Sequence, residues 1–118
     1  GFGLAPAEMM YLGKPVVATG WSANMDFMTS DNSIPVRYQL KRLEEAVGVY
    51  PAGQYWAEAD VEHAAEGLSQ LFASPELRQK MGQQAAADIR RQLSPQAVGA
   101  LVQERLSLLG FWYPELRP

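Results

Sequence analysis

The sequence contains no cysteine and only one histidine, His63, among its 118 residues. Without cysteine, the chain can form no disulfide, no thiolate metal site and no cysteine nucleophile. A chain without disulfides suits a reducing compartment, and we expect a cytoplasmic protein. His63 falls outside the apolar stripe of its predicted helix, which indicates a solvated helix face rather than a catalytic or metal-binding role.

The chain also lacks any run of lysine or arginine, and its formal net charge is -3. Nucleic-acid binding needs a dense basic face, so we expect no nucleic-acid partner. No apolar segment reaches the length of a bilayer and no signal peptide precedes the first predicted helix, so we expect no membrane span. The apolar fraction of 47% is enough for the core of one small domain or of part of a larger one.

The amino terminus begins Gly1-Phe2-Gly3-Leu4 without an initiator methionine. A glycine-rich turn that opens a helix normally follows a strand, so we expect a fragment of a longer α/β domain. The pattern of residues 1–59 predicts alternating helices and strands, with the first strand in a parallel sheet. The predicted elements are a helix over Leu4–Leu12, a strand over Pro15–Thr19, a short helix over Asn24–Met28, a strand over Ile34–Tyr38, a helical turn over Lys41–Ala46 and a short strand over Tyr55–Ala57.

Residues 60–110 predict three closing helices. Asp60, Ser74-Pro75 and Ser94-Pro95 are helix-start signals, because a side-chain oxygen can cap the first turn and proline is tolerated there. The aromatic tail over 111–114 should dock on another surface. The expected fold is therefore α/β, a partial Rossmann-like domain with few parallel strands followed by helices. The apolar stripes that should pack are Val61, Ala64, Ala65, Leu68, Leu71 and Phe72, then Leu77, Met81, Ala85 and Ile89, then Val98, Leu101, Val102 and Leu108.

Two segments are candidates for binding, because ligands of open parallel sheets bind beyond the carboxyl ends of strands. The first runs from Gly1 through Phe2 and Gly3 to Leu4, where glycines allow close approach and a helix start favours phosphate. Glu8 lies one turn further along an otherwise apolar helix. Its carboxylate could accept hydrogen bonds from a cis-diol, or it could face solvent or pair with Lys14.

The second segment follows the Pro15–Thr19 strand and includes Ser22, Asn24 and Asp26. Asn24 and Asp26 could bind sugar hydroxyls, whereas the local alternative is that these polar residues cap or begin a short helix. Trp21 is the aromatic residue best placed to stack on a ring, because it follows the carboxyl end of a strand. For Trp56 and Trp112 core packing or domain docking is the expected role.

The residues Gly1-Phe2-Gly3-Leu4-Ala5-Pro6-Ala7-Glu8, followed by Gly13-Lys14-Pro15-Val16-Val17-Ala18-Thr19, closely resemble the donor-site signature of glycosyltransferase family 4 (group 1). The family motif is a glutamate, seven residues and a second glutamate. Here Gly1–Ala7 match the intervening residues and Glu8 the second glutamate, while the first glutamate falls before Gly1. The likeness is specific across residues 1–28 and 54–95.

The resemblance implies a piece of a retaining enzyme of the GT-B fold, in which two Rossmann-like domains face a cleft. Glu8 would hold the ribose of a UDP- or GDP-hexose, and the amides around Phe2, Gly3 and Leu4 would meet the sugar and its diphosphate. A hexose would pass to the hydroxyl of a glycan or lipid-linked acceptor, held by the missing amino-terminal domain, for example in polysaccharide biosynthesis. The family generally uses no bound metal, and no other cofactor is implied.

No catalytic residue is identified in the chain, and the isolated fragment should be catalytically silent. Two alternatives remain open from the sequence. One is a nucleotide-sugar epimerase or phosphorylase of similar two-domain architecture. The other is a non-catalytic helical interaction module that keeps the fold without the chemistry.

Overall fold

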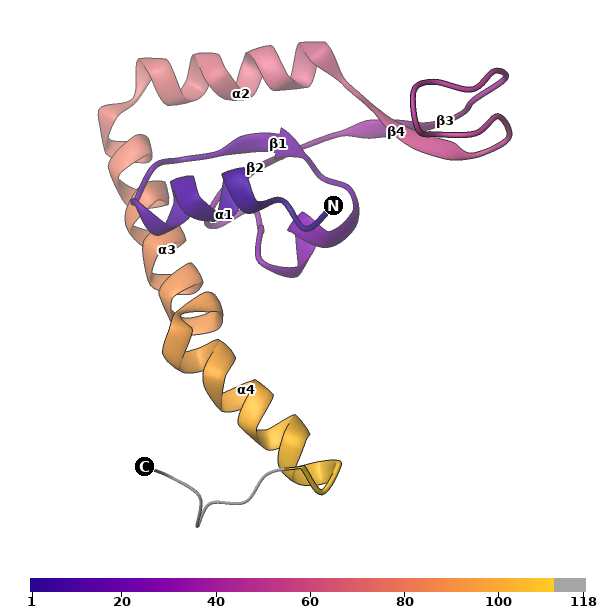
Figure 1. Cartoon of the computed structure of the whole chain (residues 1–118). Coiled ribbons are helices and arrows are strands. Elements are labelled where there is room, and N and C mark those ends of the chain that lie inside the picture. Colours follow the sequence, from indigo (N-terminus) through magenta and orange to yellow (C-terminus); the bar gives the residue numbers. More distant parts are fainter. Residues whose placement is uncertain (112–118) are drawn as a thin grey trace.

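The first helix, α1 (Leu4–Tyr11), begins directly after the amino-terminal glycines and ends in a tight turn at Gly13. The Gly13 backbone N–H donates to the Met10 carbonyl at 2.9 Å, which closes that turn. The sequence prediction for this helix is confirmed to within one residue. The computed structural model describes residues 1–111 of the chain, and Figure 1 shows their arrangement.

A two-stranded parallel sheet lies at the centre of the fold. Strand β1 (Val17–Thr19) pairs with β2 (Ile34–Val36), with Val17 opposite Ile34 and Thr19 opposite Val36. Helix α2 (Val61–Ala73) lies against one face of the pair and α1 lies on the other side (Figure 1). The predicted parallel pairing with helices on both faces is therefore confirmed, although β1 is shorter than the predicted strand.

A 3₁₀ helix, η1 (Ser22–Asp26), follows β1 and leads to two buried residues, Phe27 and Met28. It begins two residues before the short helix that the sequence predicts. The residue at its amino-terminal boundary is Trp21, and no side chain caps it. The expectation that Ser22 or Asn24 serves as a cap is therefore wrong, because the Asn24 side chain bonds elsewhere.

An antiparallel hairpin, absent from the sequence prediction, projects from the rest of the molecule (Figure 1). Strand β3 (Tyr38–Arg42) pairs with β4 (Tyr55–Ala59), with Tyr38 opposite Ala59 and Arg42 opposite Tyr55. The helical turn predicted over Lys41–Ala46 is wrong, because Lys41 and Arg42 complete β3 by pairing with Trp56 and Tyr55. The strand predicted at 55–57 is confirmed and extends to Ala59.

Three helices complete the described chain: α2, α3 (Pro75–Leu93) and α4 (Pro95–Leu108). The three predicted caps are all present. The Asp60 carboxylate accepts from the His63 backbone N–H, the Ser74 hydroxyl from that of Leu77, and the Ser94 hydroxyl from that of Ala97. Each cap satisfies a backbone donor that has no partner within its helix.

The core forms where α3 crosses α1. Here α3 contributes Ala85 and Ile89 from its predicted stripe, and the cluster consists of Ala7, Met10, Val16, Phe27, Met28, Ala85 and Ile89. Gly82 permits this crossing, because a Cβ at that position would overlap the Gly13 carbonyl oxygen and lie 3.0 Å from the Gly13 carbonyl carbon. The two backbones therefore touch, and no other residue type fits at position 82 without moving one of them.

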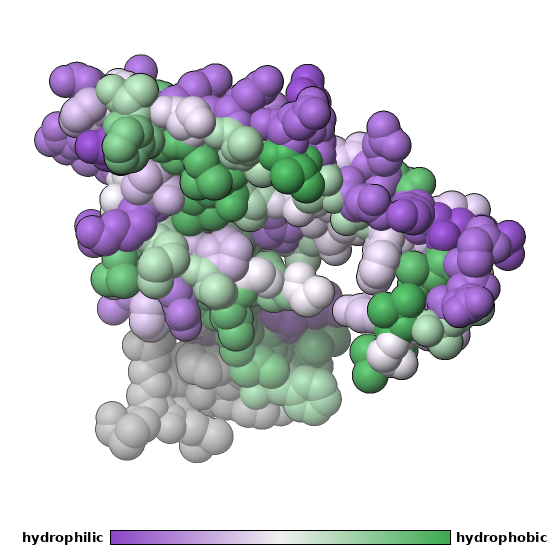
Figure 2. Space-filling model, turned by 90° about the horizontal axis from the view of Figure 1, so that it is seen from above, coloured by the Kyte–Doolittle hydropathy of each residue, from purple (hydrophilic) through white to green (hydrophobic). Residues whose placement is uncertain are grey.

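The apolar stripes predicted for α2 and α4 are mostly open to solvent, contrary to expectation. On α2, Leu71 is buried, but Val61 and Leu68 are exposed and Phe72 is 87% exposed. Helix α4 buries no residue. Figure 2 shows apolar side chains on the surface of both the helical part and the hairpin. The chain is correspondingly extended, with a radius of gyration of 18.4 Å, against about 13 Å for a compact domain of about 100 residues.

The predicted docking of the aromatic tail can be followed only at Phe111, which is exposed. Trp112, Tyr113 and Pro114 lie outside the described residues.

The exposed apolar stripes of α2 and α4 have a simple cause. Helices α2 and α4 lie at the periphery, and nothing within residues 1–111 packs against their outer faces.

Replacing Gly82 with alanine should lower the free energy of unfolding by about 1–3 kcal/mol, because the new methyl group forces α3 away from α1. Gly99→Ala is the matched control. A Cβ at Gly99 in α4 meets nothing within 4 Å, so this change should stabilise the helix by about 0.5–1 kcal/mol. Urea unfolding followed by circular dichroism measures both. Equal effects of the two substitutions would contradict the close contact.

Candidate functional site

A hollow of about 500 Å³ opens beyond the carboxyl end of β1, where a parallel sheet is expected to bind its ligand. We call it the rim hollow. Three parts of the chain line it: the start of α1, the segment from β1 into η1, and the hairpin with its loop. Its lining residues are Gly1, Gly3, Pro6, Ala18, Thr19, Trp21, Ser22, Asn24, Leu43, Tyr50, Gln54, Tyr55, Trp56 and Ala57.

Gly3 and Pro6 place the start of α1 beside this hollow, and backbone donors at that start have no partner within the helix. Gly3 adopts a left-handed conformation (φ 88°), and no side chain caps the helix. The helix's first hydrogen bond runs from the Ala7 N–H to the Gly3 carbonyl. The N–H groups of Leu4 and Ala5 precede that bond, and Pro6 has no N–H. An uncapped helix start of this kind attracts an anion through its N–H groups and its dipole.

Gly3 also brings the helix start close to η1. A Cβ at Gly3 would lie 3.2 Å from the Asn24 Cβ, so a side chain there would crowd the contact. The Asn24 Nδ2 donates to the Thr19 carbonyl at 2.9 Å and lies 3.3 Å from the Met28 sulfur. Both bonds use the amide nitrogen. They fix Asn24 at the end of β1 and leave its Oδ1 for a hydroxyl donor.

The predicted site residues do not all meet in the rim hollow. Gly1, Gly3 and Asn24 do. Glu8 and Leu4 border a smaller hollow of about 300 Å³, between α1 and the α3–α4 junction. Its lining is otherwise made by Phe2, Ala7, Tyr11, Ile89, Leu93 and Val98.

Phe2 lies between the Glu8 hollow and another hollow. It lines the Glu8 hollow and also a third hollow, which contains Asp26 together with Arg91 and Glu104. Its ring packs on the buried Phe27 ring, with centroids 5.4 Å apart. The predicted residues are thus distributed over three separate hollows around the start of α1.

Glu8 is an exposed residue of α1. Within residues 1–111 it forms no ion pair with Lys14, so that alternative for its carboxylate is wrong. The wall of this hollow presents almost no polar surface, so Glu8 borders it chiefly through its apolar atoms. The Glu8 carboxylate is exposed to solvent beside this hollow, which is the other alternative that the sequence left open.

Aromatic residues gather at the rim hollow, and the sequence indicated only one of them. Trp21 packs on Tyr38 of β3, with ring centroids 5.1 Å apart, and stays 41% exposed. Tyr50 and Tyr55 also line the hollow. Trp56, expected in the core or at a docking surface, borders the same hollow and is partly exposed. The two tyrosines were missed because no local pattern shows how the hairpin folds back.

A polar network around the buried Asn32 fixes the turn after η1 on α3, and no local sequence pattern indicates it. The Asn32 Oδ1 accepts from the Thr29 N–H at 2.8 Å, and its Nδ2 donates to the Phe27 carbonyl and to Asp88 Oδ2, both at 3.0 Å. Arg91 and Gln84 donate to the same carboxylate. These bonds, with that from Arg91 the largest cause, lower the pKa of Asp88 below its ordinary value.

His63 is not simply solvated, contrary to expectation. Its Nδ1 accepts a hydrogen bond of 3.0 Å from the Arg37 backbone N–H, which joins the base of the hairpin to α2. The Arg37 guanidinium also pairs with the Asp60 carboxylate at 3.2 Å. The Asp60 cap bond from the His63 N–H and this ion pair lower the pKa of Asp60.

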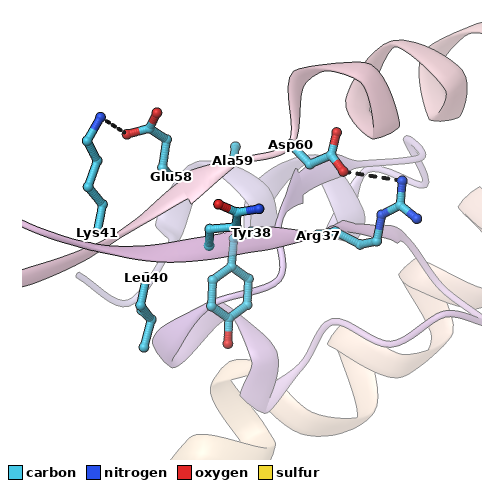
Figure 3. A pocket seen from close by; sticks show the side chains of 8 residues that line it. Arg37, Tyr38, Leu40, Lys41, Glu58, Ala59 and Asp60 are labelled. Carbon is cyan, nitrogen blue, oxygen red and sulfur yellow. Dashed lines mark ion pairs between the residues drawn. The ribbon is translucent and has the colours of Figure 1, made fainter.

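A further hollow of about 730 Å³ runs along the hairpin (Figure 3). Its charged side chains are already paired with each other: Arg37 with Asp60, and Lys41 with Glu58 at 2.9 Å. Ion pairs of this exposed kind contribute little energy but occupy the groups that a ligand would need. We therefore take the rim hollow, with the adjoining Glu8 hollow, as the candidate site.

Comparison with family models, with curated proteins and with solved structures finds no match to this chain. None of the helices in the described part has both the length and the apolar composition needed to cross a bilayer. Over the same residues, no three histidine, aspartate or glutamate side chains are grouped as metal ligands.

Replacing Asp88 with asparagine should destabilise the protein by about 1 kcal/mol or more at pH 7, because charge-assisted hydrogen bonds to Asn32 and Arg91 are lost. The folded state lowers the pKa of Asp88, so its contribution is present above the ordinary carboxyl pKa of about 3.9 and disappears as the pH falls through the lowered value. The difference between wild type and variant should therefore shrink on acidification, as urea unfolding at several pH values would measure.

Asp31→Asn is the control for this series, because the Asp31 carboxylate has no hydrogen-bond partner among residues 1–111. Its effect should stay within about 0.5 kcal/mol at pH 7. An Asp88 variant as stable as the Asp31 variant would show that the network does not hold the turn.

Proposed function

We propose that this chain is the donor-binding part of a retaining glycosyltransferase of family 4 (group 1), within a Rossmann-like domain of the GT-B fold. In the whole enzyme it binds a UDP- or GDP-hexose, and the hexose passes to the hydroxyl of a glycan or lipid-linked acceptor. One observation carries the proposal: the uncapped start of α1 and the carboxyl end of β1 border a single hollow.

The diphosphate is assigned to the start of α1. The N–H groups of Leu4 and Ala5 supply donors, and the positive end of the helix dipole favours two adjacent phosphate groups. The same donors stabilise the negative charge that grows on the diphosphate as the bond to the sugar breaks. Gly3 keeps this approach open, because it carries no side chain between the helix start and Asn24.

The two hollows on either side of the helix start suit the two ends of a nucleotide sugar. The hexose lies in the rim hollow, near the Asn24 amide and the exposed aromatic residues. The nucleoside lies in the Glu8 hollow, where the apolar wall receives the base and the Glu8 carboxylate accepts hydrogen bonds from the ribose diol. Glu8 thus contributes from the neighbouring hollow, in the role that the resemblance implies for it.

A helical interaction module is the second candidate, and the exposed apolar stripes of α2 and α4 favour it. Such a module would bind a protein through those stripes and would have no use for the free amides at the start of α1. Nucleotide binding therefore separates the two functions.

Calorimetric titration of the folded 118-residue chain with UDP, GDP, UDP-glucose and GDP-mannose tests the proposal. We expect binding of one nucleotide and of its sugar derivative. Glu8→Ala should weaken binding of that nucleotide by about 10- to 150-fold, because a charged hydrogen bond to the ribose is lost.

Glu66→Ala is the control, because Glu66 is an exposed acid of α2 that lines none of the hollows described above. It should leave the affinity unchanged. Absence of nucleotide binding, or an equal loss in both variants, would remove the support for a transferase and leave the interaction module.

A further inference from the structure

We propose that protonation of His63 releases the base of the β3–β4 hairpin from α2, so that the attachment of the hairpin depends on pH. His63 is the only histidine in the sequence, and histidine is the side chain that ordinarily changes its charge between pH 8 and pH 5. The release requires no nucleotide and does not depend on the proposed function.

The bond at the hairpin base uses a lone pair of the neutral His63 ring. The His63 Nδ1 accepts the Arg37 backbone N–H at 3.0 Å. Arg37 lies between β2 and β3, where the chain enters the hairpin, and His63 lies in the first turn of α2. A ring nitrogen that accepts a hydrogen bond carries no proton, so the neutral ring has its proton on Nε2. A second proton goes to Nδ1, converts it into a donor and breaks the bond.

The Arg37 N–H has lost its ordinary acceptor to the start of α2. The Asp60 N–H donates to the Arg37 carbonyl at 2.8 Å, which continues the hairpin ladder by one bond. In a regular antiparallel pair the reverse bond would run from the Arg37 N–H to the Asp60 carbonyl. That carbonyl instead accepts the Ala64 N–H at 3.0 Å, as the first bond of α2. His63 supplies the replacement acceptor, and only in its neutral form.

Two charged groups at the hairpin base act on the His63 ring. The Arg37 guanidinium pairs with the Asp60 carboxylate at 3.2 Å (Figure 3), and the His63 backbone N–H donates to the same carboxylate. The bond from His63 first, and then the charge of Arg37, lower the pKa of Asp60, so this group stays ionised at pH 5. A protonated ring is attracted to the carboxylate and repelled by the guanidinium. Protonation therefore draws the ring away from Arg37 and makes it compete for Asp60.

The other elements that pack on α2 bring no charge to this point. Strands β1 and β2 contain no ionisable residue. Helix α3 meets the opposite end of α2, where Arg78 donates to carbonyl groups of the last turn. On α2 itself Glu62 and Glu66 are exposed to solvent, and Glu58 of β4 is already in an ion pair. Among the described residues, the charge balance at the hairpin base is thus set by the three groups named above.

Loss of this bond matters because the hairpin projects from the rest of the molecule (Figure 1). Its ladder is internal, with Arg42 opposite Tyr55, and does not need His63. We therefore expect the hairpin to separate from α2 as a unit, with its strands still paired. Since Tyr55 lines the rim hollow, the shape of that hollow then varies with pH, although His63 lies outside it.

Amide hydrogen exchange, followed by NMR on the folded 118-residue chain at pH 7.5 and pH 5.5, tests the proposal. Exchange rates are converted to protection factors, which removes the intrinsic pH dependence of exchange. The protection factor of the Arg37 amide should fall by about 3- to 10-fold at pH 5.5, because one hydrogen bond is lost. The Leu43 amide, which donates to the Gln54 carbonyl at 2.8 Å, should keep its protection at both pH values.

His63→Asn and His63→Ala are the matched variants, and both keep every other ionisable group of the chain. The asparagine Oδ1 stands in for Nδ1 and accepts at every pH, so the Arg37 protection factor should no longer depend on pH. Alanine offers no acceptor, so Arg37 protection should be low at both pH values and close to that of the protonated wild type.

Three results would overturn the proposal. One is an Arg37 protection factor that stays constant in the wild type, and another is an equal fall in His63→Asn. The third is an equal fall at Leu43, because the hairpin would then unfold and not separate from α2. If His63→Ala does not fold, as circular dichroism would show, the comparison of wild type with His63→Asn decides the question. Nucleotide titrations bear only on the proposed function.

Discussion

Helix α3 can lie against α1 only because position 82 has no side chain, which lets its backbone touch the Gly13 turn. That contact brings Ala85 and Ile89 onto Ala7 and Met10, and these four residues form much of the buried cluster. It also brings Asp88 within reach of Asn32, which fixes the turn after η1. The direction of α1, the position of η1 and therefore the opening between them all depend on one backbone approach.

The segments that line the rim hollow differ in how closely they pack on the rest of the molecule. The start of α1 and η1 adjoin the core, whereas Tyr50 and Tyr55 belong to a hairpin that stands away from it (Figure 1). A ligand in the hollow would therefore contact the start of α1 and η1 on one side and the less closely packed hairpin on the other. For such a ligand, the polar groups on the first side would set orientation and the aromatic rings on the hairpin would provide surface contact.

The sequence predicted the ends of helices well, because a single capping or turn residue is enough to start or stop a helix. Asp60, Ser74 and Ser94 cap the helices that they predict, and Gly13 ends α1. The hairpin could not be predicted, because pairing of Lys41 and Arg42 with Trp56 and Tyr55 is a non-local choice. For the same reason, Tyr50 and Tyr55 went unnoticed as site residues. The apolar stripes of α2 and α4 were predicted to be buried but are mostly exposed. Periodicity predicts that a helix has an apolar face, but it does not predict whether another element covers that face.

The hairpin meets the helical part at a narrow neck. Arg37 donates its N–H to His63 and pairs with Asp60, and the Asp60 N–H donates to the Arg37 carbonyl. A small molecule bound against both Tyr55 and Asn24 would give the hairpin a second point of attachment to the helical part, in addition to its base. Fixing the hairpin in this way would cost conformational entropy, and that cost would make the binding free energy less favourable. The stiffness of this Arg37–His63 connection would therefore influence the affinity for such a molecule, although neither residue lines the rim hollow.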